Sequence, residues 1–478
     1  MIQLITHPLT LLLLAVELVV LGRAMLRPNR EPTSRLAWVI VIIVLPVVGI
    51  VAYLLLGEAR VSRSRRERGR TIDASLPLPA CDEEAAGFLA DSTYAAPFAL
   101  ARTVNRLGPT GGNRATLAAD SNAAIDQIVA DMDAARDHVH ACFYIWLADT
   151  NGLKIRDALI RAADRGVTVR VLADALGSRL LIRSAHWRAM TDAGVELKVA
   201  LPVGNLLWTM TRGRVDLRNH RKLVVVDNII AWCGSQNAAD PEFKIKPHYA
   251  PWVDLMARFV GPVARHWQFL FISDWMGEGG EDLSSMLTGP APAADGPILA
   301  QVIGTGPTLP YAAMTACFAE LVHSARTELV VTTPYFVPDE QLLYSLLSAA
   351  RRGVIVRLLL PERNDSRIVA AASRSLYRDL LDAGVELYEY RLGLLHAKTM
   401  VADGTIALIG SANLDRRSFE LNFENNILFH DPSFAAAVRA RQDEWLADCR
   451  RVTMAHVDRF GLFERLWQNF LAMFGPLL

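Results

Sequence analysis

The sequence predicts an α/β protein built from two similar halves, in which helices flank mixed sheets, preceded by a hairpin of two membrane helices. Three observations support this prediction. They are an uncharged run of 22 residues near the N-terminus, an internal duplication, and a motif that occurs once in each half. Repeats that alternate helical and strand patterns are typical of paired α/β units.

The composition excludes several classes of protein. The 50 basic and 50 acidic residues of the 478-residue chain cancel, whereas nucleic-acid-binding proteins usually carry a basic excess. A hydrophobic fraction of 52% excludes a disordered or collagen-like chain. The five cysteines are scattered and lack CxxC spacing, so we predict neither a disulfide framework nor a zinc site. They are Cys81, Cys142, Cys233, Cys317 and Cys449.

Two apolar segments predict the membrane hairpin. Residues 36–57 are uncharged and long enough, at about 1.5 Å per residue, to cross about 30 Å of hydrocarbon, although Pro46 can kink the helix. Residues 2–22 form a second candidate helix that carries Glu17. A signal peptide is the alternative, but no Lys or Arg precedes this apolar region.

Arginines next to these helices bear on membrane orientation. Four lie between the two predicted helices, at positions 23, 27, 30 and 35. Six follow the second helix, at positions 60, 63, 65, 66, 68 and 70. This small excess favours a multi-pass membrane protein with both termini and its body on the cytoplasmic side.

Repeated sequence marks the two halves. Residues 162–172 (AADRGVTVRVL) are echoed by residues 349–359 (AARRGVIVRLL), and DAGVEL occurs at 192–197 and again at 382–387. In each copy a helical stretch ends at a glycine and a valine-rich strand follows, as in a βαβ unit. We expect a membrane hairpin (1–57), a connector (58–114), a first half (115–278), a linker (279–297), a second half (298–454) and a C-terminal amphipathic segment (455–478).

One motif occurs in each half with identical spacing. Its first copy consists of His220, Lys222, Asp227, Gly234, Ser235 and Asn237, and its second of His396, Lys398, Asp403, Gly410, Ser411 and Asn413. A lone His-x-Lys pair is usually an exposed polar pair on a strand. A second copy that matches at six positions indicates a functional site.

The residue types of the motif suit phosphate chemistry. Positions i and i+2 of a strand face the same side, so each histidine stands beside a lysine that can hold an anionic oxygen. Glycine permits close backbone approach, and hydroxyl and amide groups add donors. We therefore predict that Ser235, Asn237, Ser411 and Asn413 bind a substrate phosphate. Two facing motifs would supply one imidazole as nucleophile and another as general acid.

The two motif aspartates have two interpretations. As members of the repeated motif, Asp227 and Asp403 are candidate catalytic residues. The dipeptides Asp227-Asn228 and Asp403-Gly404 are also typical of hairpin turns between β-rich runs, which favours a structural role.

The paired H-x-K-x(4)-D motifs with G-S-x-N resemble the phospholipase D superfamily, and the whole chain resembles the bacterial cardiolipin synthases with two such motifs. The resemblance covers both halves and the N-terminal hairpin, including residues 45–58 (LPVVGIVAYLLLGE). Other similar stretches are residues 143–146 (FYIW), 333–338 (TPYFVP) and 413–418 (NLDRRS). The resemblance implies two phospholipase D-like halves packed as a pseudo-dimer.

The resemblance also implies phosphatidyl transfer without a metal or nucleotide, with phosphatidylglycerol and cardiolipin of the bilayer as partners. One histidine attacks phosphatidylglycerol, the other protonates the departing glycerol, and a second phosphatidylglycerol accepts the phosphatidyl group to give cardiolipin. In this family a carboxylate after G-S-x-N orients each histidine. The matches are Glu424, 28 residues after His396, and Asp254, 34 residues after His220. A solvated or turn carboxylate is the alternative for both.

Other functions stay open at this stage. A phospholipase D that releases phosphatidic acid would use the same intermediate, and a non-catalytic lipid-binding scaffold would use the same surface. The neutral charge and the membrane helices disfavour a nuclease. The patterns do not identify the nucleophilic histidine, the acyl-chain preference or the oligomeric state.

Two surface features also have alternative interpretations. Apolar residues of the C-terminal segment recur at helical spacing, which suits an interfacial helix and core packing equally. They are Phe463, Leu466, Trp467, Phe470, Leu471 and Phe474. Arginines near the first motif either attract anionic headgroups or form a solvated basic loop. They are Arg212, Arg214, Arg218 and Arg221.

Overall fold

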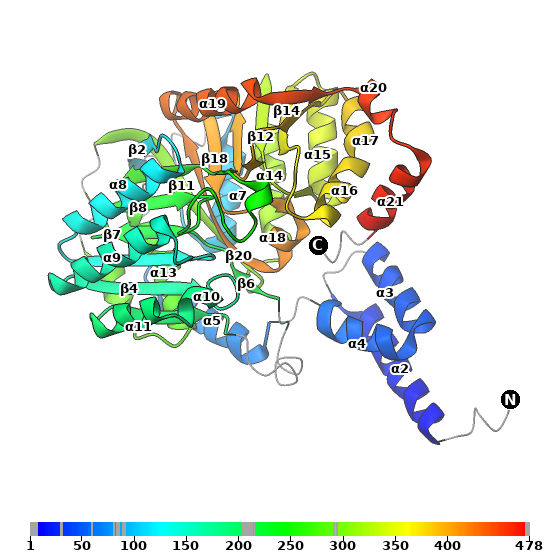
Figure 1. Ribbon diagram of the computed structural model, residues 1–478, viewed down its shortest axis with the longest axis horizontal. Helices are drawn as coiled ribbons and strands as arrows, with labels where there is room; N and C mark the ends of the chain where they lie inside the picture. The colour runs from blue at the N-terminus through cyan, green and yellow to red at the C-terminus, as the bar shows by residue number, and fades with distance from the viewer. Residues whose placement is uncertain are drawn as a thin grey trace. The chain divides into compact units, whose positions relative to one another are not determined.

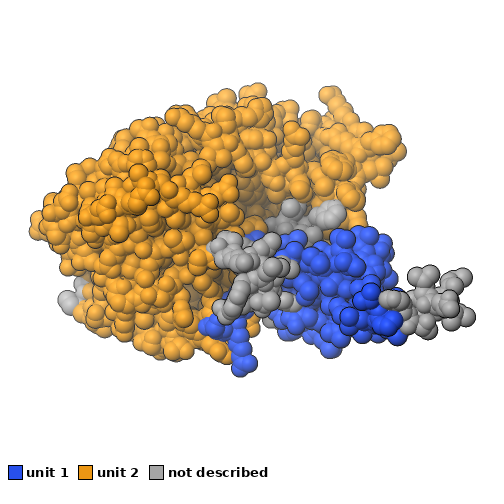
Figure 2. Space-filling model, turned by 60° about the horizontal axis from the view of Figure 1, so that its bottom comes forward, with its two compact units in different colours: residues 1–64, 203–216, 477 blue, residues 65–202, 217–476, 478 orange. Residues whose placement is uncertain are grey.

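The computed structural model describes residues 8–28, 32–58, 61–79, 82, 87, 92–202, 214, 216–289, 292 and 295–473. The chain forms two compact units (Figure 2). The smaller consists of residues 1–64, 203–216 and 477, and the larger of residues 65–202, 217–476 and 478. The larger unit contains both copies of the motif.

The smaller unit contains three apolar helices. They are α2 (Pro8–Leu26), α3 (Pro32–Val44) and α4 (Pro46–Leu56). Within the described residues, α2 alone is long and apolar enough to cross a membrane, so the predicted N-terminal apolar helix is confirmed. Residues 2–7 of the predicted helix lie outside the described residues.

The predicted continuous helix over residues 36–57 is wrong, because the structure breaks it at Leu45 into α3 and α4. Pro46 has no N–H to continue the helical ladder, and its ring disfavours helical geometry at the residue before it. A methyl group built on Gly49 would overlap the carbonyl oxygen of Val41. In a straight helix these two residues would be about 12 Å apart along the axis, so α4 bends sharply back on α3.

The larger unit contains two mixed sheets flanked by helices (Figure 1). One sheet has ten strands and the other seven, and a run of six strands has the same order in both. The first half contributes β2 (Arg114–Leu117), β3 (His138–Phe143), β4 (Thr168–Asp174), β5 (Glu196–Ala200), β6 (Arg218–Asn219), β7 (Leu223–Val226), β8 (Ile230–Gly234), β9 (Trp252–Val253) and β10 (Met256–Val260). Its helices are α8 (Ser121–Ala134), α9 (Thr150–Asp164), α10 (Arg179–Ile182), α11 (Ala185–Asp192) and α13 (Ala264–Gly277).

The second half repeats this layout. Its strands are β11 (Gly296–Thr305), β12 (Glu328–Thr332), β13 (Phe336–Val337), β14 (Ile355–Pro361), β15 (Glu386–Tyr390), β16 (Leu394–Leu395), β17 (Thr399–Ala402), β18 (Ile406–Gly410), β19 (Leu414–Asp415), β20 (Asn422–His430) and β21 (Cys449–Val452). Its helices are α14 (Ala313–Ser324), α15 (Glu340–Arg351), α16 (Arg367–Ser375), α17 (Tyr377–Asp382), α18 (Arg416–Glu420), α19 (Pro432–Ala447), α20 (Met454–Val457) and α21 (Leu462–Ala472).

The strand orders confirm the duplication. The run β10-β8-β7-β3-β4-β5 in one sheet corresponds to β20-β18-β17-β12-β14-β15 in the other. In both runs the last three strands are parallel and the others antiparallel. The repeated sequences form matching helix–strand pairs, α9–β4 with α15–β14 and α11–β5 with α17–β15. Both halves therefore have the predicted mixed-sheet architecture.

The connector, whose fold the sequence did not specify, joins both sheets. Its elements are α5 (Arg63–Ser75), α7 (Ala95–Asn105) and β1 (Thr110–Gly112). Strand β1 pairs with β11 of the second sheet, whereas β2 pairs with β10 of the first. A shared apolar core holds the sheets together, with Val225 and Phe259 from the first sheet and Ile427 and Phe429 from the second.

Candidate active site

Each motif histidine follows a two-residue strand that pairs with the opposite half. Strand β6, which precedes His220, runs parallel to the start of β20. Strand β16, which precedes His396, runs parallel to β9. Both histidines are buried, with exposed fractions of 8% and 3%. These pairings bring the two motifs to the junction between the halves.

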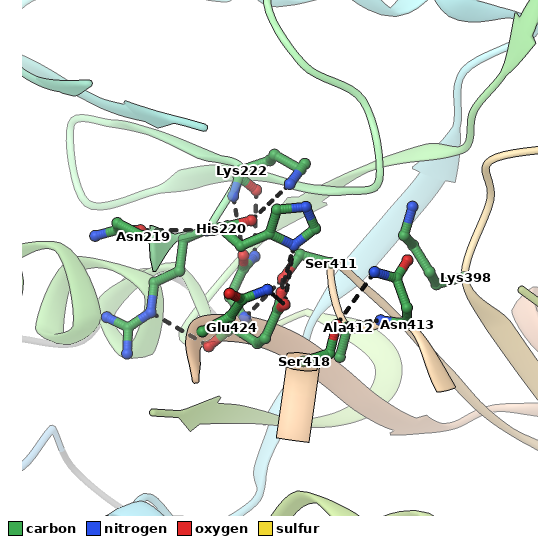
Figure 3. A network of polar contacts seen from close by, with 12 residues as sticks. Asn219, His220, Lys222, Lys398, Ser411, Ala412, Asn413, Ser418 and Glu424 are labelled. Atoms are coloured by element: carbon green, nitrogen blue, oxygen red, sulfur yellow. Dashed lines mark hydrogen bonds and ion pairs between the residues drawn. The ribbon is translucent and has the colours of Figure 1, made fainter. Parts of the chain in front are cut away.

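The two predicted carboxylates contact the histidines in a crossed arrangement. Both carboxylate oxygens of Glu424 lie 2.9 Å from Nδ1 of His220 (Figure 3). Oδ1 of Asp254 lies 2.6 Å from Nδ1 of His396. Each carboxylate therefore contacts the histidine of the other half, although the sequence match located it by its distance from the histidine of its own half.

The motif serines contact these carboxylates. The hydroxyl of Ser235 donates to Oδ1 of Asp254 at 2.6 Å and accepts the N–H of Leu255. The hydroxyl of Ser411 likewise donates to Glu424 and accepts a backbone N–H. Each hydroxyl proton is directed at a carboxylate, so each serine fixes a carboxylate that in turn orients a histidine. The predicted phosphate-binding role of the two serines stays a prediction.

The motif asparagines lie beside the serines and are buried. Oδ1 of Asn237 accepts the N–H of Ile145 at 3.0 Å. Nδ2 of Asn413 donates to the hydroxyl of Ser418 at 3.1 Å (Figure 3). The contact of Asn413 uses one of the two N–H groups of its side-chain amide. The contact of Asn237 uses its amide oxygen and neither N–H group.

The two lysines connect the motifs electrostatically. Nζ of Lys222 donates to the carbonyl of His220 at 2.6 Å, and Nζ of Lys398 donates to the carbonyl of His396 at the same distance. The charge of each lysine also lowers the pKa of the histidine of the other half. The two motifs are therefore close enough for the charge of each to act on the other.

Burial sets the protonation states of the site. It lowers the pKa of His220 to about 4, although Glu424 opposes this shift, and it also lowers the pKa of His396. Burial lowers the pKa of Lys222 to about 8 and that of Lys398 to about 7. For Asp254, burial acts against ionisation, but His396 and Lys398 outweigh it and the pKa falls to about 2. Neutral imidazoles thus lie beside ionised carboxylates.

The motif aspartates lie at the far ends of β7 and β17 from the histidines. The carboxylate of Asp227 accepts the N–H groups of residues 136–138, and that of Asp403 accepts those of residues 326–328. Both residues occupy left-handed turn conformations, with φ of 53°. Their assignment as catalytic residues is therefore wrong, since they hold hairpin turns as the turn spacing favours.

Aromatic rings lie against both histidines, a feature that sequence reasoning missed. The ring of Tyr144 meets His220 edge-on with centroids 4.8 Å apart, and Trp252 lies 4.6 Å from His396. Tyr144 belongs to the FYIW stretch, and Trp252 precedes Asp254 by two residues. The sequence signal that could have identified these two rings was their position within or beside stretches that resemble the family.

Three of the arginines near the first motif are buried. Arg214, Arg218 and Arg221 are 6%, 3% and 4% exposed. Arg221 donates to Asp274 at 2.7 Å and to the backbone carbonyl of Glu424 at 3.2 Å. The solvated-loop interpretation is therefore wrong for these three, while Arg212 lies outside the described residues.

Comparisons with known proteins agree with this geometry. A family model described as "Cardiolipin synthase, PLD-like domain" matches residues 128–247 and 318–445. A second, described as "Phospholipase_D-nuclease N-terminal", matches residues 12–58. Cardiolipin synthase A of Escherichia coli O1:K1 / APEC is 36% identical over 467 residues, which cover 95% of this chain and 94% of the relative. Cardiolipin synthase A of Escherichia coli strain K12 / DH10B gives the same values.

A solved structure supports the fold alone. Phosphatidylserine synthase of Haemophilus influenzae Rd KW20 aligns with a TM-score of 0.57 at 14% identity, over 80% of this chain and 97% of its own. The matched family model and the full-length relatives establish the family. The chain belongs to the cardiolipin synthases with phospholipase D-like domains.

Proposed function

We propose that this protein is a membrane phosphatidyltransferase that converts two phosphatidylglycerol molecules into cardiolipin and glycerol. The supporting observation is the pair of crossed histidine–carboxylate contacts at one site, His220 with Glu424 and His396 with Asp254. A reaction that passes through a covalent intermediate needs a nucleophile and a separate proton donor, and these two pairs can supply them.

In the first step, Nε2 of one histidine attacks the phosphorus of phosphatidylglycerol. A P–N bond forms, the P–O bond to the headgroup glycerol breaks, and the second histidine gives its proton to the departing oxygen. The lowered pKa values keep the attacking imidazole neutral at neutral pH. The negative charge of the bound phosphate would favour protonation of the other imidazole.

In the second step, a headgroup hydroxyl of another phosphatidylglycerol attacks the phosphatidyl-histidine. The hydroxyl gives its proton to the second imidazole, the new P–O bond forms and the P–N bond breaks. Glu424 and Asp254 hold each ring by Nδ1 and leave Nε2 available. Lys222, Lys398 and the amides of Asn237 and Asn413 would stabilise negative charge on the non-bridging oxygens. No cofactor enters these steps.

A membrane site suits this substrate. The protein is membrane-associated, as its family and the apolar helix α2 indicate. We place it in the bacterial inner membrane with its body on the cytoplasmic side, because arginines are frequent after residue 58. Labelling of an Arg70→Cys variant by a membrane-impermeant maleimide should require permeabilised cells, and labelling in intact cells would reverse the orientation.

A product assay tests the reaction. The enzyme, purified in detergent with phosphatidylglycerol alone, should release cardiolipin and glycerol in equal amounts. His220→Ala and His396→Ala should abolish turnover, while His248→Ala, at an exposed histidine, should not. Phosphatidic acid as the main product would instead identify a phospholipase D. Unchanged turnover in both motif variants would show that these histidines are not catalytic, and absence of any product from the original chain would support a non-catalytic lipid-binding scaffold.

A covalent trap identifies the nucleophile. Phosphatidylglycerol radiolabelled in its phosphate and a quench in SDS at neutral pH should leave label on one histidine, which peptide mapping assigns to His220 or His396. The variant that lacks the acid–base histidine should still accept label, whereas the variant that lacks the nucleophile should accept none.

A further inference from the structure

The smaller unit carries a contact that two full membrane crossings do not allow. Nε and Nη2 of Arg23 donate to the two carboxylate oxygens of Glu58 at 2.8 and 3.0 Å. The hydroxyl of Tyr53 donates to the same carboxylate at 2.7 Å. Glu58 is 2% exposed, so these are the contacts of a buried charge. Arg23 lies in the last turn of α2, and Glu58 lies two residues beyond α4.

This contact brings the end of α4 back to the end of α2. If α2 crossed in one direction and residues 36–57 crossed back as one helix, Arg23 and Glu58 would lie on opposite sides of about 30 Å of hydrocarbon. The observed ion pair instead requires that α3 starts near the C-terminal end of α2 and that α4 ends near it.

The lengths of α3 and α4 agree. Their 13 and 11 residues correspond to about 20 and 16 Å, each well short of the hydrocarbon thickness. The turn between them is tight, because Gly49 lies against the backbone of Val41. The residues at the turn are apolar and exposed. They are Val44, Leu45, Val47 and Val48.

We propose that the chain crosses the bilayer once, through α2, and that α3 and α4 form a re-entrant hairpin whose turn ends inside the hydrocarbon. Both arginine clusters, at positions 23–35 and 60–70, then lie on the same side of the membrane. Ten arginines on one side give a stronger orientation signal than four against six. The N-terminus lies on the opposite side from the catalytic body.

Cysteine labelling in the full-length chain separates the two topologies. Gln3→Cys, Asn29→Cys and Arg70→Cys are treated with a membrane-impermeant maleimide in intact and permeabilised cells, and the unsubstituted chain gives the background of the native cysteines. A single crossing predicts that residues 29 and 70 label together and that residue 3 labels under the opposite condition. If residues 3 and 70 label together and residue 29 differs, two spans exist and the proposal is wrong. The readout does not depend on activity, so a failure of this topology can be distinguished from a failure of the proposed reaction.

A second, independent observation concerns α21 on the larger unit. Its buried residues are Gln468 and Leu471, and Ala472 packs against the cluster of Val337, Val369 and Ala372. Its opposite side is apolar and exposed, with Phe463 86%, Trp467 57% and Met473 74% exposed. The remaining members are Leu462, Leu466 and Phe470. At about 100° per residue, these six positions form one continuous stripe, wider than an ordinary helix buries.

We infer that this stripe of α21 binds the surface of the bilayer. The protein is membrane-associated, and aromatic residues with a nearby cation, here Arg465, are typical of helices that lie in the headgroup region. The helix is also joined to the second motif by packing. Val337, on β13, is paired with Asp415, two residues after Asn413. A bilayer bound to α21 would therefore lie near the wall of the candidate active site.

Spin labels test this contact in vesicles of phosphatidylglycerol and phosphatidylethanolamine. Leu466→Cys is compared with Glu444→Cys on α19, in a chain with Cys81 and Cys449 replaced by serine. The label at residue 466 should be accessible to oxygen and shielded from a water-soluble nickel complex, and the label at 444 should behave oppositely. Dipolar coupling between labels at 466 would indicate a second copy, and shielding from both reagents would indicate a protein cover. Either result, or free access of nickel, would overturn the inference.

Discussion

Lys222 and Lys398 connect the chemistry of single residues to the pH dependence of the enzyme. Their pKa values, lowered by burial to about 8 and about 7, mean that each is charged below that pH and neutral above it. Because the charged form would hold the phosphate, kcat/KM should fall as pH rises through this range. Replacing Lys398 by Arg keeps the charge at every such pH, so the decline should move from about 7 toward about 8.

The control for this prediction is Lys398→Met, which should lower kcat by roughly 10²- to 10³-fold at every pH, because it removes the charge permanently. The measurement is initial rate against pH in detergent micelles for the three proteins. A decline that stays near the same pH in the Lys398→Arg variant would assign the titration to another group.

Asp403 and Glu424 should respond differently to loss of charge. Asp403→Asn should cost about 1–3 kcal/mol of stability with kcat nearly unchanged, because its carboxylate accepts loop N–H groups far from the histidines. Glu424→Gln should lower kcat by roughly 10²- to 10⁴-fold, because it removes the charged carboxylate that holds Nδ1 of His220 and would stabilise the imidazolium formed during the reaction. Thermal unfolding and single-turnover rates in detergent separate the two effects.

The sign of the pH effect checks the Asp403 assignment. The backbone N–H contacts of Asp403 lower its pKa. The stability that the ionised carboxylate contributes is therefore complete above its pKa in the unfolded chain and is lost as pH falls. The difference in Tm between the original chain and Asp403→Asn should therefore shrink in acid. A constant difference, or a large loss of kcat, would contradict a purely structural role.

At the scale of elements, the short pairing of β6 with β20 holds the site together. Asn425, on β20, clamps the first motif, because its Oδ1 accepts the N–H of Lys222 and its Nδ2 donates to the Lys222 carbonyl. Asn425→Ala should destabilise the protein by about 1–3 kcal/mol and also lower kcat, because Glu424 moves relative to His220. Asn105→Ala removes another buried amide contact, to Val302 on β11, and should affect stability alone. Equal kcat in both variants would show that the clamp does not position the site.

The elements also show which parts of the fold the sequence could predict. The repeats at 162–172 and 349–359 became α9–β4 and α15–β14 because their helical and strand periods are local properties. The pairing of β6 with β20 joins residues about 200 positions apart through two residues a side, and no periodic pattern marks it. For the same reason the sequence identified Glu424 as a carboxylate that orients a histidine, but it did not identify His220 as the histidine that Glu424 contacts. Pro46 signalled a possible kink, whereas the reversal at Gly49 depends on tertiary packing.

At the scale of the whole molecule, the crossed contacts make one chain the smallest unit that can contain the complete site. His220 needs Glu424 and His396 needs Asp254, and β1 of the connector and β2 of the first half pair with different sheets and tie them into one body. This arrangement predicts how two inactive chains behave together. His220→Ala and His396→Ala variants, purified separately and mixed in the same micelles, should stay as inactive as either alone, because each site lacks one imidazole and neither chain can lend its own. The measurement is cardiolipin formation by the mixture, compared with the sum of the two variants. Mixing the original chain with either variant should give only the activity of the original chain. Recovery of activity in the mixture of variants would mean that halves exchange between chains, so that the site of one protein is completed by another.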